Sequence, residues 1–288
     1  MMRFAYYPGC TAKGSTPEVD LATQWLANKL EIELVELVEA GCCGSCEVKA
    51  VNPTLHLLLN ARILALAEAK DLEILTVCDT CQANLIQTGR RLDADQSLAT
   101  VVWQKLIRTG VSYMNKPRAR HLVKILAEEF GADKLRQYVN RPLTGLKVAP
   151  FSCCHVFRGA GSEPQNRPLI DEMIAISGAT GISVRLEGDC CGFHILMVNP
   201  KLAARAAGKF LTRCAEAKVD CITTTSPLCH TALDIYQDFA ESVTGNKIGI
   251  PVLHIEQLLA LSLGSSPTEV GLQRHVVSTG ELVRKLVA

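Results

Sequence analysis

The sequence has no long hydrophobic run and no excess of either charge. Its longest apolar stretch, from Leu55 to Ala67, is broken by His56, Asn60 and Arg62, whereas a membrane-spanning helix needs about 20 apolar residues. Thirty Lys and Arg residues balance 29 Asp and Glu residues, for a formal net charge of +1. Without a basic run, a large surface for nucleic acid or for an anionic membrane is not supported.

Nucleotide-binding fingerprints and an export signal are also missing. Neither Gly-x-Gly-x-x-Gly nor the phosphate-binding Gly-x₄-Gly-Lys-Ser/Thr pattern occurs. The N-terminus reads MMRFAYYPGC, in which the apolar run is too short for a signal peptide. We therefore expect a protein made and kept in the cytoplasm. A length of 288 residues, 48% of them hydrophobic and 20% charged, predicts two domains that each bury a core.

The number of cysteines is unusual. The chain has 13 cysteines, an odd number that suits metal binding or redox chemistry in a reducing compartment better than structural disulfides. They lie at Cys10, Cys42, Cys43, Cys46, Cys78, Cys81, Cys153, Cys154, Cys190, Cys191, Cys214, Cys221 and Cys229.

The cysteine spacing occurs twice. Cys10, Cys42-Cys43-Gly44 and Cys78-x-x-Cys81 in the first half match Cys154, Cys190-Cys191-Gly192 and Ser226-x-x-Cys229 in the second half, with serine where the first half has Cys78. An Asn-Pro pair follows each cysteine pair, at Asn52-Pro53 and Asn199-Pro200, and predicts an N-cap with proline at the first helical position. The chain is therefore a duplication of a unit of roughly 145 residues.

Short apolar runs and longer helical patterns alternate within each half. This alternation predicts the α/β class, as two pseudo-equivalent open-sheet, Rossmann-like domains that span residues 1–140 and 141–288. In such sheets ligands bind beyond the carboxyl ends of the strands, where these cysteines fall. The predicted strands are 4–7, 34–38, 74–77, 148–151, 184–186 and 222–225, and the predicted helices are 17–29, 53–70, 120–138, 166–177, 200–217 and 227–239.

Five cysteines from three loops of the first half suit a soft-ligand metal site. Zinc and iron–sulfur clusters both accept thiolates, but adjacent cysteines fit one tetrahedral ion poorly, whereas a cluster offers several irons. The spacing therefore favours a cluster over zinc. Buried, inert cysteines would not explain a repeated spacing.

These residues resemble the cysteine-rich CCG domain found in the B subunit of heterodisulfide reductase. The similarity covers nearly the whole chain and includes Tyr-Tyr-Pro-Gly-Cys10, Cys154-His155-Val-Phe-Arg158, Cys190-Cys191-Gly192-Phe193-His194, Pro227-Leu228-Cys229-His230 and the closing segment from Pro251. The resemblance implies two noncubane 4Fe-4S clusters with the substrate disulfide cleaved between them. The first would be held by Cys10, Cys42, Cys43, Cys78 and Cys81, and the second by Cys154, Cys190, Cys191 and Cys229.

Ser226 departs from the family pattern, because it stands where a fifth cysteine is expected. Serine ionises far less readily than cysteine, so the second cluster is expected to be held by four cysteines, to be altered, or to be replaced by another metal. The departure favours the heterodisulfide reductase-like complex of sulfur oxidisers over the methanogenic enzyme.

Other residues near these positions have a structural and a functional interpretation. Cys46 and Cys153 are either packing residues or additional ligands, and Cys214 and Cys221 are expected in the core. Lys13 and Arg158 are either surface charges or attract an anionic substrate. His155, His194 and His230 follow ligands of the second repeat closely; they are either structural or donate a proton to a leaving thiolate or a hydrogen bond to a cluster sulfur.

The resulting hypothesis is an iron–sulfur oxidoreductase component that acts on a disulfide, thiol or sulfane-sulfur substrate within a complex. One alternative is an electron-relay component of a fumarate, succinate or hydroxy-acid oxidoreductase, and another is a zinc-bearing scaffold. The resemblance implies homologues of the ferredoxin-like C subunit and of the flavin-containing A subunit of heterodisulfide reductase as partners. The sequence fixes neither the substrate nor the direction of electron flow nor the stoichiometry of the complex.

Overall fold

The computed structural model describes residues 2–111, 118–155, 167–186 and 188–287. Two compact units make up the chain. Unit 1 contains Met1–Cys10, Ala27–Leu122 and His155–Pro164, and unit 2 contains Thr11–Leu26, Val123–Cys154 and Gln165–Ala288. Two segments, 11–26 and 123–154, thus group with unit 2 although the rest of that unit follows later in the chain. The predicted domain border at residue 140 stays a prediction.

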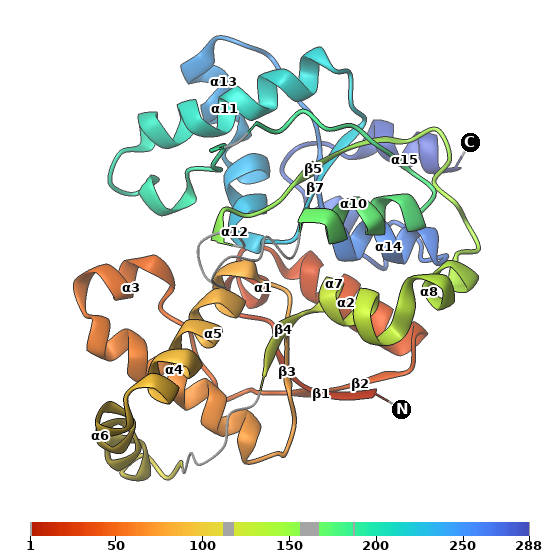
Figure 1. Cartoon of the computed structure of the whole chain (residues 1–288). Coiled ribbons are helices and arrows are strands. Elements are labelled where there is room, and N and C mark those ends of the chain that lie inside the picture. Colours follow the sequence, from red (N-terminus) through yellow and green to blue (C-terminus); the bar gives the residue numbers. More distant parts are fainter. Residues whose placement is uncertain (1, 112–117, 156–166, 187, 288) are drawn as a thin grey trace. The chain divides into compact units, whose positions relative to one another are not determined.

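Unit 1 is built on a four-stranded parallel sheet with the order β2-β1-β3-β4 (Figure 1). Its core joins the sheet to α4 and α5, where Ile63, Leu64 and Leu85 are fully buried. The strands are β1 (Met2–Tyr7), β2 (Ile32–Glu36), β3 (Ile74–Thr76) and β4 (Ala119–His121), and the helices are α3 (Ser45–Val51), α4 (Pro53–Glu68), α5 (Asp79–Ala94) and α6 (Gln96–Ile107). Two further helices, α1 (Cys10–Lys13) and α2 (Pro17–Lys29), span the division between the units.

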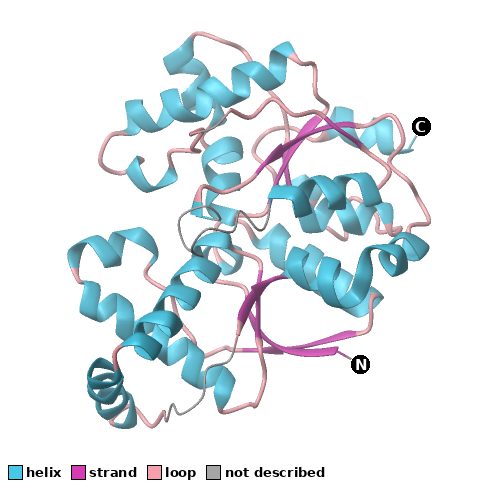
Figure 2. Ribbon diagram, viewed as in Figure 1, coloured by secondary structure: helices cyan, strands magenta, loops and turns pink. Residues whose placement is uncertain are grey.

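Unit 2 repeats this sheet, with four parallel strands in the order β6-β5-β7-β8. Helices flank the strands in each unit, as the cyan and magenta ribbons of Figure 2 show. The strands are β5 (Lys147–Phe151), β6 (Thr180–Gly181), β7 (Cys221–Thr224) and β8 (Val252–His254). The helices are α7 (Leu122–Ile125), α8 (Ala132–Tyr138), α10 (Arg167–Ile176), α11 (Pro200–Glu216), α12 (Pro227–His230), α13 (Gln237–Thr244), α14 (Ile255–Ser262) and α15 (Gly280–Val287), with π-helical turns at Leu126–Gly131 and Thr231–Ile235 and 3₁₀ turns at Phe193–Ile195 and Leu272–Arg274.

The predicted α/β class and the duplication are confirmed. Both sheets have the same strand order, with β5 in the place of β1 and β7 in the place of β3. The predicted helix caps also match: the Asn52 side chain accepts a hydrogen bond from the Leu55 amide at 2.9 Å, and the Asn199 side chain accepts one from the Leu202 amide at 3.1 Å. A proline begins the helix after each cap.

Three predicted elements are wrong in detail, and one of them is the helix expected over 227–239, which divides into α12, a π-helical turn and α13. The strand expected at 184–186 lies earlier, at Thr180–Gly181, because side chains bind the backbone groups of the predicted segment: Asp189 accepts from the Leu186 amide at 2.7 Å, and Arg213 donates to the Val184 carbonyl at 2.9 Å. The helix expected over 120–138 begins with strand β4 and then divides into α7, a π-helical turn and α8.

Candidate metal centres

The predicted cysteines of unit 1 follow the carboxyl ends of its central strands. Cys10 comes three residues after β1, and Cys78 comes two residues after β3. Their loops meet the loop that follows β2. The Sγ atoms of Cys10 and Cys42 are 3.3 Å apart, and those of Cys43 and Cys81 are 3.5 Å apart. Thiols of residues more than 30 positions apart in the sequence are thus in contact. They lie beyond the carboxyl ends of the strands, where parallel α/β folds bind ligands.

The glycine after each cysteine pair is required by the backbone. Gly44 and Gly192 have φ values of 80° and 78°, in the left-handed region that glycine adopts at low cost. A Cβ atom on Gly44 would lie 2.9 Å from Val48 Cβ, and one on Gly192 would lie 2.7 Å from the Ala203 carbonyl oxygen. This turn directs each glycine amide to a cysteine sulfur, at 3.3 Å to Cys42 and 3.4 Å to Cys190.

Buried polar side chains support the unit 1 cysteines, and sequence reasoning did not identify them. Asn60 donates to the Cys43 carbonyl oxygen at 2.8 Å, and Asn84 donates to the Cys43 sulfur at 3.7 Å. The Tyr7 hydroxyl donates to the Gly41 carbonyl oxygen at 3.0 Å. An asparagine inside an apolar helix was the available signal for Asn60, since a buried amide needs partners.

The unit 1 thiols strongly affect each other's ionisation. Hydrogen bonds with Cys42 and Cys81 lower the pKa of Cys43 well below its usual value. Hydrogen bonds with Cys43 and Cys78, followed by burial, raise the pKa of Cys81 well above its usual value. Close thiols without a cation cannot all ionise, because like charges in a buried site repel each other. The donor set therefore fits a cation that several thiolates neutralise together.

Unit 2 gathers its predicted cysteines in the same way. The sulfurs of Cys154 and Cys190 are 4.0 Å apart. Hydrogen bonds with Cys154 and Cys191 lower the pKa of Cys190 to about 2, while the hydrogen bond with Cys190 and burial raise the pKa of Cys191. Cys229 is buried, and its thiol contacts Cys191. Cys154, Cys190 and Cys191 from two loops and Cys229 from helix α12 are therefore close neighbours in this unit too.

Ser226 has the backbone placement of Cys78. Ser226 caps α12 with φ and ψ of −127° and 120°, and Cys78 caps α5 with −131° and 115°. In both units a threonine hydroxyl accepts the amide hydrogen of the capping residue, Thr224 at 3.3 Å and Thr76 at 3.4 Å. Ser226 is fully buried, and its hydroxyl has no hydrogen-bond partner among the residues that the structure describes.

The donor sets fit iron–sulfur clusters better than single zinc ions. All 13 cysteines are free thiols. Each unit presents more than the four ligands that a structural zinc ion takes, if Cys46 and Cys153 are counted. Cys214 and Cys221 are instead core residues, as expected: both are fully buried, and burial raises their pKa, to about 12 for Cys214.

His155 lies in a polar group within unit 1. Its Nε2 atom is 3.1 Å from the Cys46 sulfur, and its Nδ1 atom is 3.5 Å from the Thr80 hydroxyl. The side chain is buried, with 9% of its surface exposed. Cys46 and His155 therefore form a pair that the sequence analysis did not connect.

His230 lies in a buried group of titratable side chains. His230 is buried with His275 and Glu18: its Nε2 atom is 3.2 Å from His275 Nδ1, and its Nδ1 atom is 3.7 Å from Glu18 Oε1. Burial, followed by repulsion from His254 and His275, lowers the pKa of His230 well below its usual value. Burial therefore favours the neutral ring of His230, and its Nδ1 atom has no hydrogen-bond partner among the residues that the structure describes.

The remaining predicted residues are placed as follows. His194 is half-buried in the 3₁₀ turn after Gly192, with its ring 5.6 Å from that of Phe193. Lys13 forms an ion pair with Asp20 at 2.8 Å. Arg158 lies outside the described residues.

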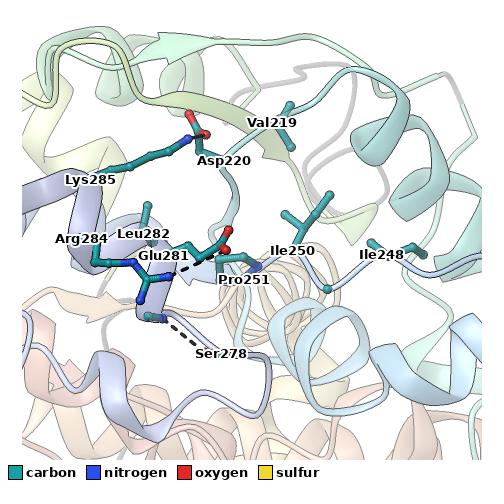
Figure 3. A pocket seen from close by; sticks show the side chains of 12 residues that line it. Val219, Asp220, Ile248, Ile250, Pro251, Ser278, Glu281, Leu282, Arg284 and Lys285 are labelled. Carbon is teal, nitrogen blue, oxygen red and sulfur yellow. Dashed lines mark hydrogen bonds and ion pairs between the residues drawn. The ribbon is translucent and has the colours of Figure 1, made fainter.

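A cavity of about 560 Å³ lies beside the amino-terminal ends of strands in the unit 2 sheet. Its lining residues Asp220 and Pro251 directly precede β7 and β8, and α15 contributes the opposite wall (Figure 3). Asp220 pairs with Lys285, and Glu281 pairs with Arg284. No cysteine is among its lining residues. The thiols lie at the carboxyl ends of these parallel strands, so the cavity and the thiols are separate features.

Comparison with known proteins identifies one domain type twice. The family described as "CCG: Cysteine-rich domain" matches residues 4–86 and 148–234. The 8-methylmenaquinol:fumarate reductase membrane anchor subunit of Wolinella succinogenes is 32% identical, with 97% of this chain and 98% of that protein aligned. The B subunit of the ferredoxin/F(420)H(2)-dependent CoB-CoM heterodisulfide reductase of Methanosarcina acetivorans is 30% identical, with 99% and 97% aligned.

A solved structure shares the fold. It is a crystal structure of a hypothetical protein from Helicobacter pylori, with a TM-score of 0.76 and 15% identity, covering 96% of this chain and 52% of the other. This chain therefore spans about half the length of that one. Among the described residues, no helix has the length and apolar character needed to span a bilayer.

Proposed function

Because the chain belongs to the CCG cysteine-rich domain family, we propose that it is the iron–sulfur component of an oxidoreductase complex that acts on a disulfide, thiol or sulfane-sulfur substrate. The observation that carries this proposal is the convergence of thiols in each unit, at equivalent ends of two sheets with one strand order. A relative at 30% identity is named as part of a heterodisulfide reductase.

Noncubane 4Fe-4S clusters are the proposed cofactors, one in each unit. The proposed ligands are Cys10, Cys42, Cys43, Cys78 and Cys81 in unit 1, and Cys154, Cys190, Cys191 and Cys229 in unit 2. A bound cluster supplies one-electron chemistry, and two of them match the two electrons that a disulfide takes up when its S–S bond breaks.

The chain's own residues would hold and tune these clusters. The amides of Gly44 and Gly192 and the side chain of Asn84 donate to cysteine sulfurs, and such hydrogen bonds set the reduction potential of a thiolate-held cluster. Tyr7 is buried in the same core cluster as Cys43, Cys78 and Cys81 and would shield that side of a bound cluster from water, whereas Cys10 and Cys42 are exposed. The ring nitrogens of His155 lie beside the Cys46 sulfur and the Thr80 hydroxyl, and from this position the imidazole would donate a proton to a leaving thiolate. The same role for His194 and His230 stays a prediction.

The partners would be homologues of the ferredoxin-like C subunit and the flavin-containing A subunit of heterodisulfide reductase. Cytoplasmic localisation, expected from the cysteine usage, belongs to this proposal as well. A second candidate function is supported by the Wolinella relative, whose name places it in a fumarate reductase. In that case the chain would relay electrons within a complex and would bind no sulfur substrate.

The test is iron and acid-labile sulfide analysis of the protein after anaerobic purification, with zinc measured in the same samples. We expect iron and sulfide in nearly equal amounts, and a Cys43→Ser variant that loses iron while Cys221→Ser, a core control, keeps it. Zinc without sulfide would overturn the proposal in favour of a zinc-bearing scaffold. Reduction of a disulfide by the assembled complex, followed by electron paramagnetic resonance, separates the sulfur reaction from electron relay.

A further inference from the structure

The two units differ at two equivalent positions near their thiols. Counting from the ends of β1 and β5, Gly9 of unit 1 corresponds to Cys153 of unit 2. At the caps of α5 and α12, Cys78 corresponds to Ser226. Unit 2 therefore has a cysteine where unit 1 has glycine, and a serine where unit 1 has cysteine.

The geometry of unit 1 shows what a side chain after the first strand would meet. A Cβ atom built on Gly9 would lie 3.1 Å from the Cys81 sulfur, the last thiol of the set. The position two residues after the central strand β1 therefore lies beside a unit 1 thiol. In unit 1 this approach is tight and the backbone has φ +83°, and glycine fills the position.

Cys153 takes up this position in unit 2. Its side chain is 2% exposed, and its sulfur lies within 4.8 Å of the Cys154 sulfur. Its thiol is also hydrogen-bonded to Cys229, the equivalent of Cys81, and this contact is the main cause of the raised pKa of Cys229. The same thiol raises the pKa of Cys154 by a hydrogen bond and that of Cys191 by its charge. Cys153 is therefore a neighbour of the unit 2 thiols and not only of its sequence neighbour.

Ser226 is poorly suited to replace the missing thiolate. It is fully buried, and its hydroxyl has no hydrogen-bond partner among the described residues, so no donor there would stabilise an alkoxide. A hydroxyl is far less acidic than a thiol of pKa about 8.5, so ionising it in a buried site costs much more free energy.

We infer that Cys153 is the fifth thiolate ligand of the unit 2 cluster and that Ser226 is not a ligand. This inference rests on the proposed iron–sulfur cofactor. It gives each unit five thiolates, four at equivalent positions and one relocated from the start of a helix to the loop after the central strand. The unit 2 site is then fully ligated, whereas four cysteines and Ser226 would leave one iron open or bound to oxygen.

The test compares single variants of the full chain, purified anaerobically in its complex, by iron and sulfide content and by electron paramagnetic resonance. Cys153→Ser is expected to lose about half of the iron and the signal of one cluster, while the unit 1 cluster serves as an internal reference for folding. Ser226→Ala and Cys214→Ser, a buried cysteine in α11, are expected to keep all of the iron. The double variant Cys153→Gly with Ser226→Cys, which copies the unit 1 arrangement, is expected to regain the second cluster.

Each outcome decides the assignment. If the parent contains iron and its Cys153→Ser variant keeps the same iron content and spectrum, this inference is overturned while the proposed function stands. Loss of the second cluster in Ser226→Ala would have the same consequence. If Cys153→Ser loses all iron, recovery in the double variant supports the inference, and no recovery overturns it. A parent without iron or sulfide would overturn the proposed function and this assignment together.

Discussion

Replacing Gly192 by alanine separates two reasons for the glycine after a cysteine pair. One reason is its backbone, at φ 78°, and the other is its close approach to α11. Gly245 is a matched control in the same unit: it has φ 76°, but a Cβ atom built on it meets nothing within 4 Å. Alanine at Gly245 therefore carries only the conformational cost, and alanine at Gly192 carries both.

The magnitudes follow from these contacts. A left-handed conformation costs a non-glycine residue roughly 1–2 kcal/mol. At Gly192 the new Cβ atom would lie 2.7 Å from the Ala203 carbonyl oxygen and 2.8 Å from Ala203 Cα, and these backbone atoms of a helix cannot rotate away. Overpacking of this kind adds about 1–3 kcal/mol. Gly245→Ala is thus expected to cost about 1–2 kcal/mol, and Gly192→Ala about 2–5 kcal/mol.

Thermal unfolding of the two purified variants measures the difference. For a unit of this size, each kcal/mol lowers the melting midpoint by roughly 2–4 °C, so Gly192→Ala should melt clearly below Gly245→Ala. It should also weaken the hydrogen bond of the residue 192 amide to the Cys190 sulfur and so reduce the iron content. Equal melting midpoints for the two variants would refute the argument from close approach.

Two further predictions concern stability. Phe210→Ala should cost roughly 3–5 kcal/mol in unfolding free energy, because Phe210 is fully buried with its ring 4.7 Å from that of Phe151. Measured by urea unfolding, Phe210→Leu should lose less stability than Phe210→Ala. An equal or smaller loss for Phe210→Ala would contradict this prediction. Asp95 caps α6, and the Leu98 amide, followed by Ser97, lowers its pKa below 3.8. The charged carboxylate should therefore stabilise the fold above pH 3.8 and lose this effect as the pH falls through the lower pKa of the folded state. The urea midpoints of the parent and of Asp95→Asn should then converge in acid. A difference between the two midpoints that persists unchanged in acid would contradict this prediction.

Features that depend on local spacing could be predicted from the amino-acid sequence. The repeated cysteine pattern, the Asn-Pro helix starts at 52–53 and 199–200, and the alternation of strands with helices were all predicted, and the structure has the two matching sheets. Such features are readable because an N-cap, a tight turn or a strand is specified by a few consecutive residues.

Contacts between side chains of distant loops could not be predicted, because they depend on how the whole chain folds. The strand expected at 184–186 was displaced because Arg213 and Asp189 bind the backbone of that segment, and Arg213 comes from α11. Cys153 could not be told from a packing residue in the sequence, because its contact with Cys229 joins the loop after β5 to a helix after β7. The spacing of the cysteines indicates which loops can converge. The direction of each thiol depends on backbone angles and on contacts with residues that are distant in the sequence.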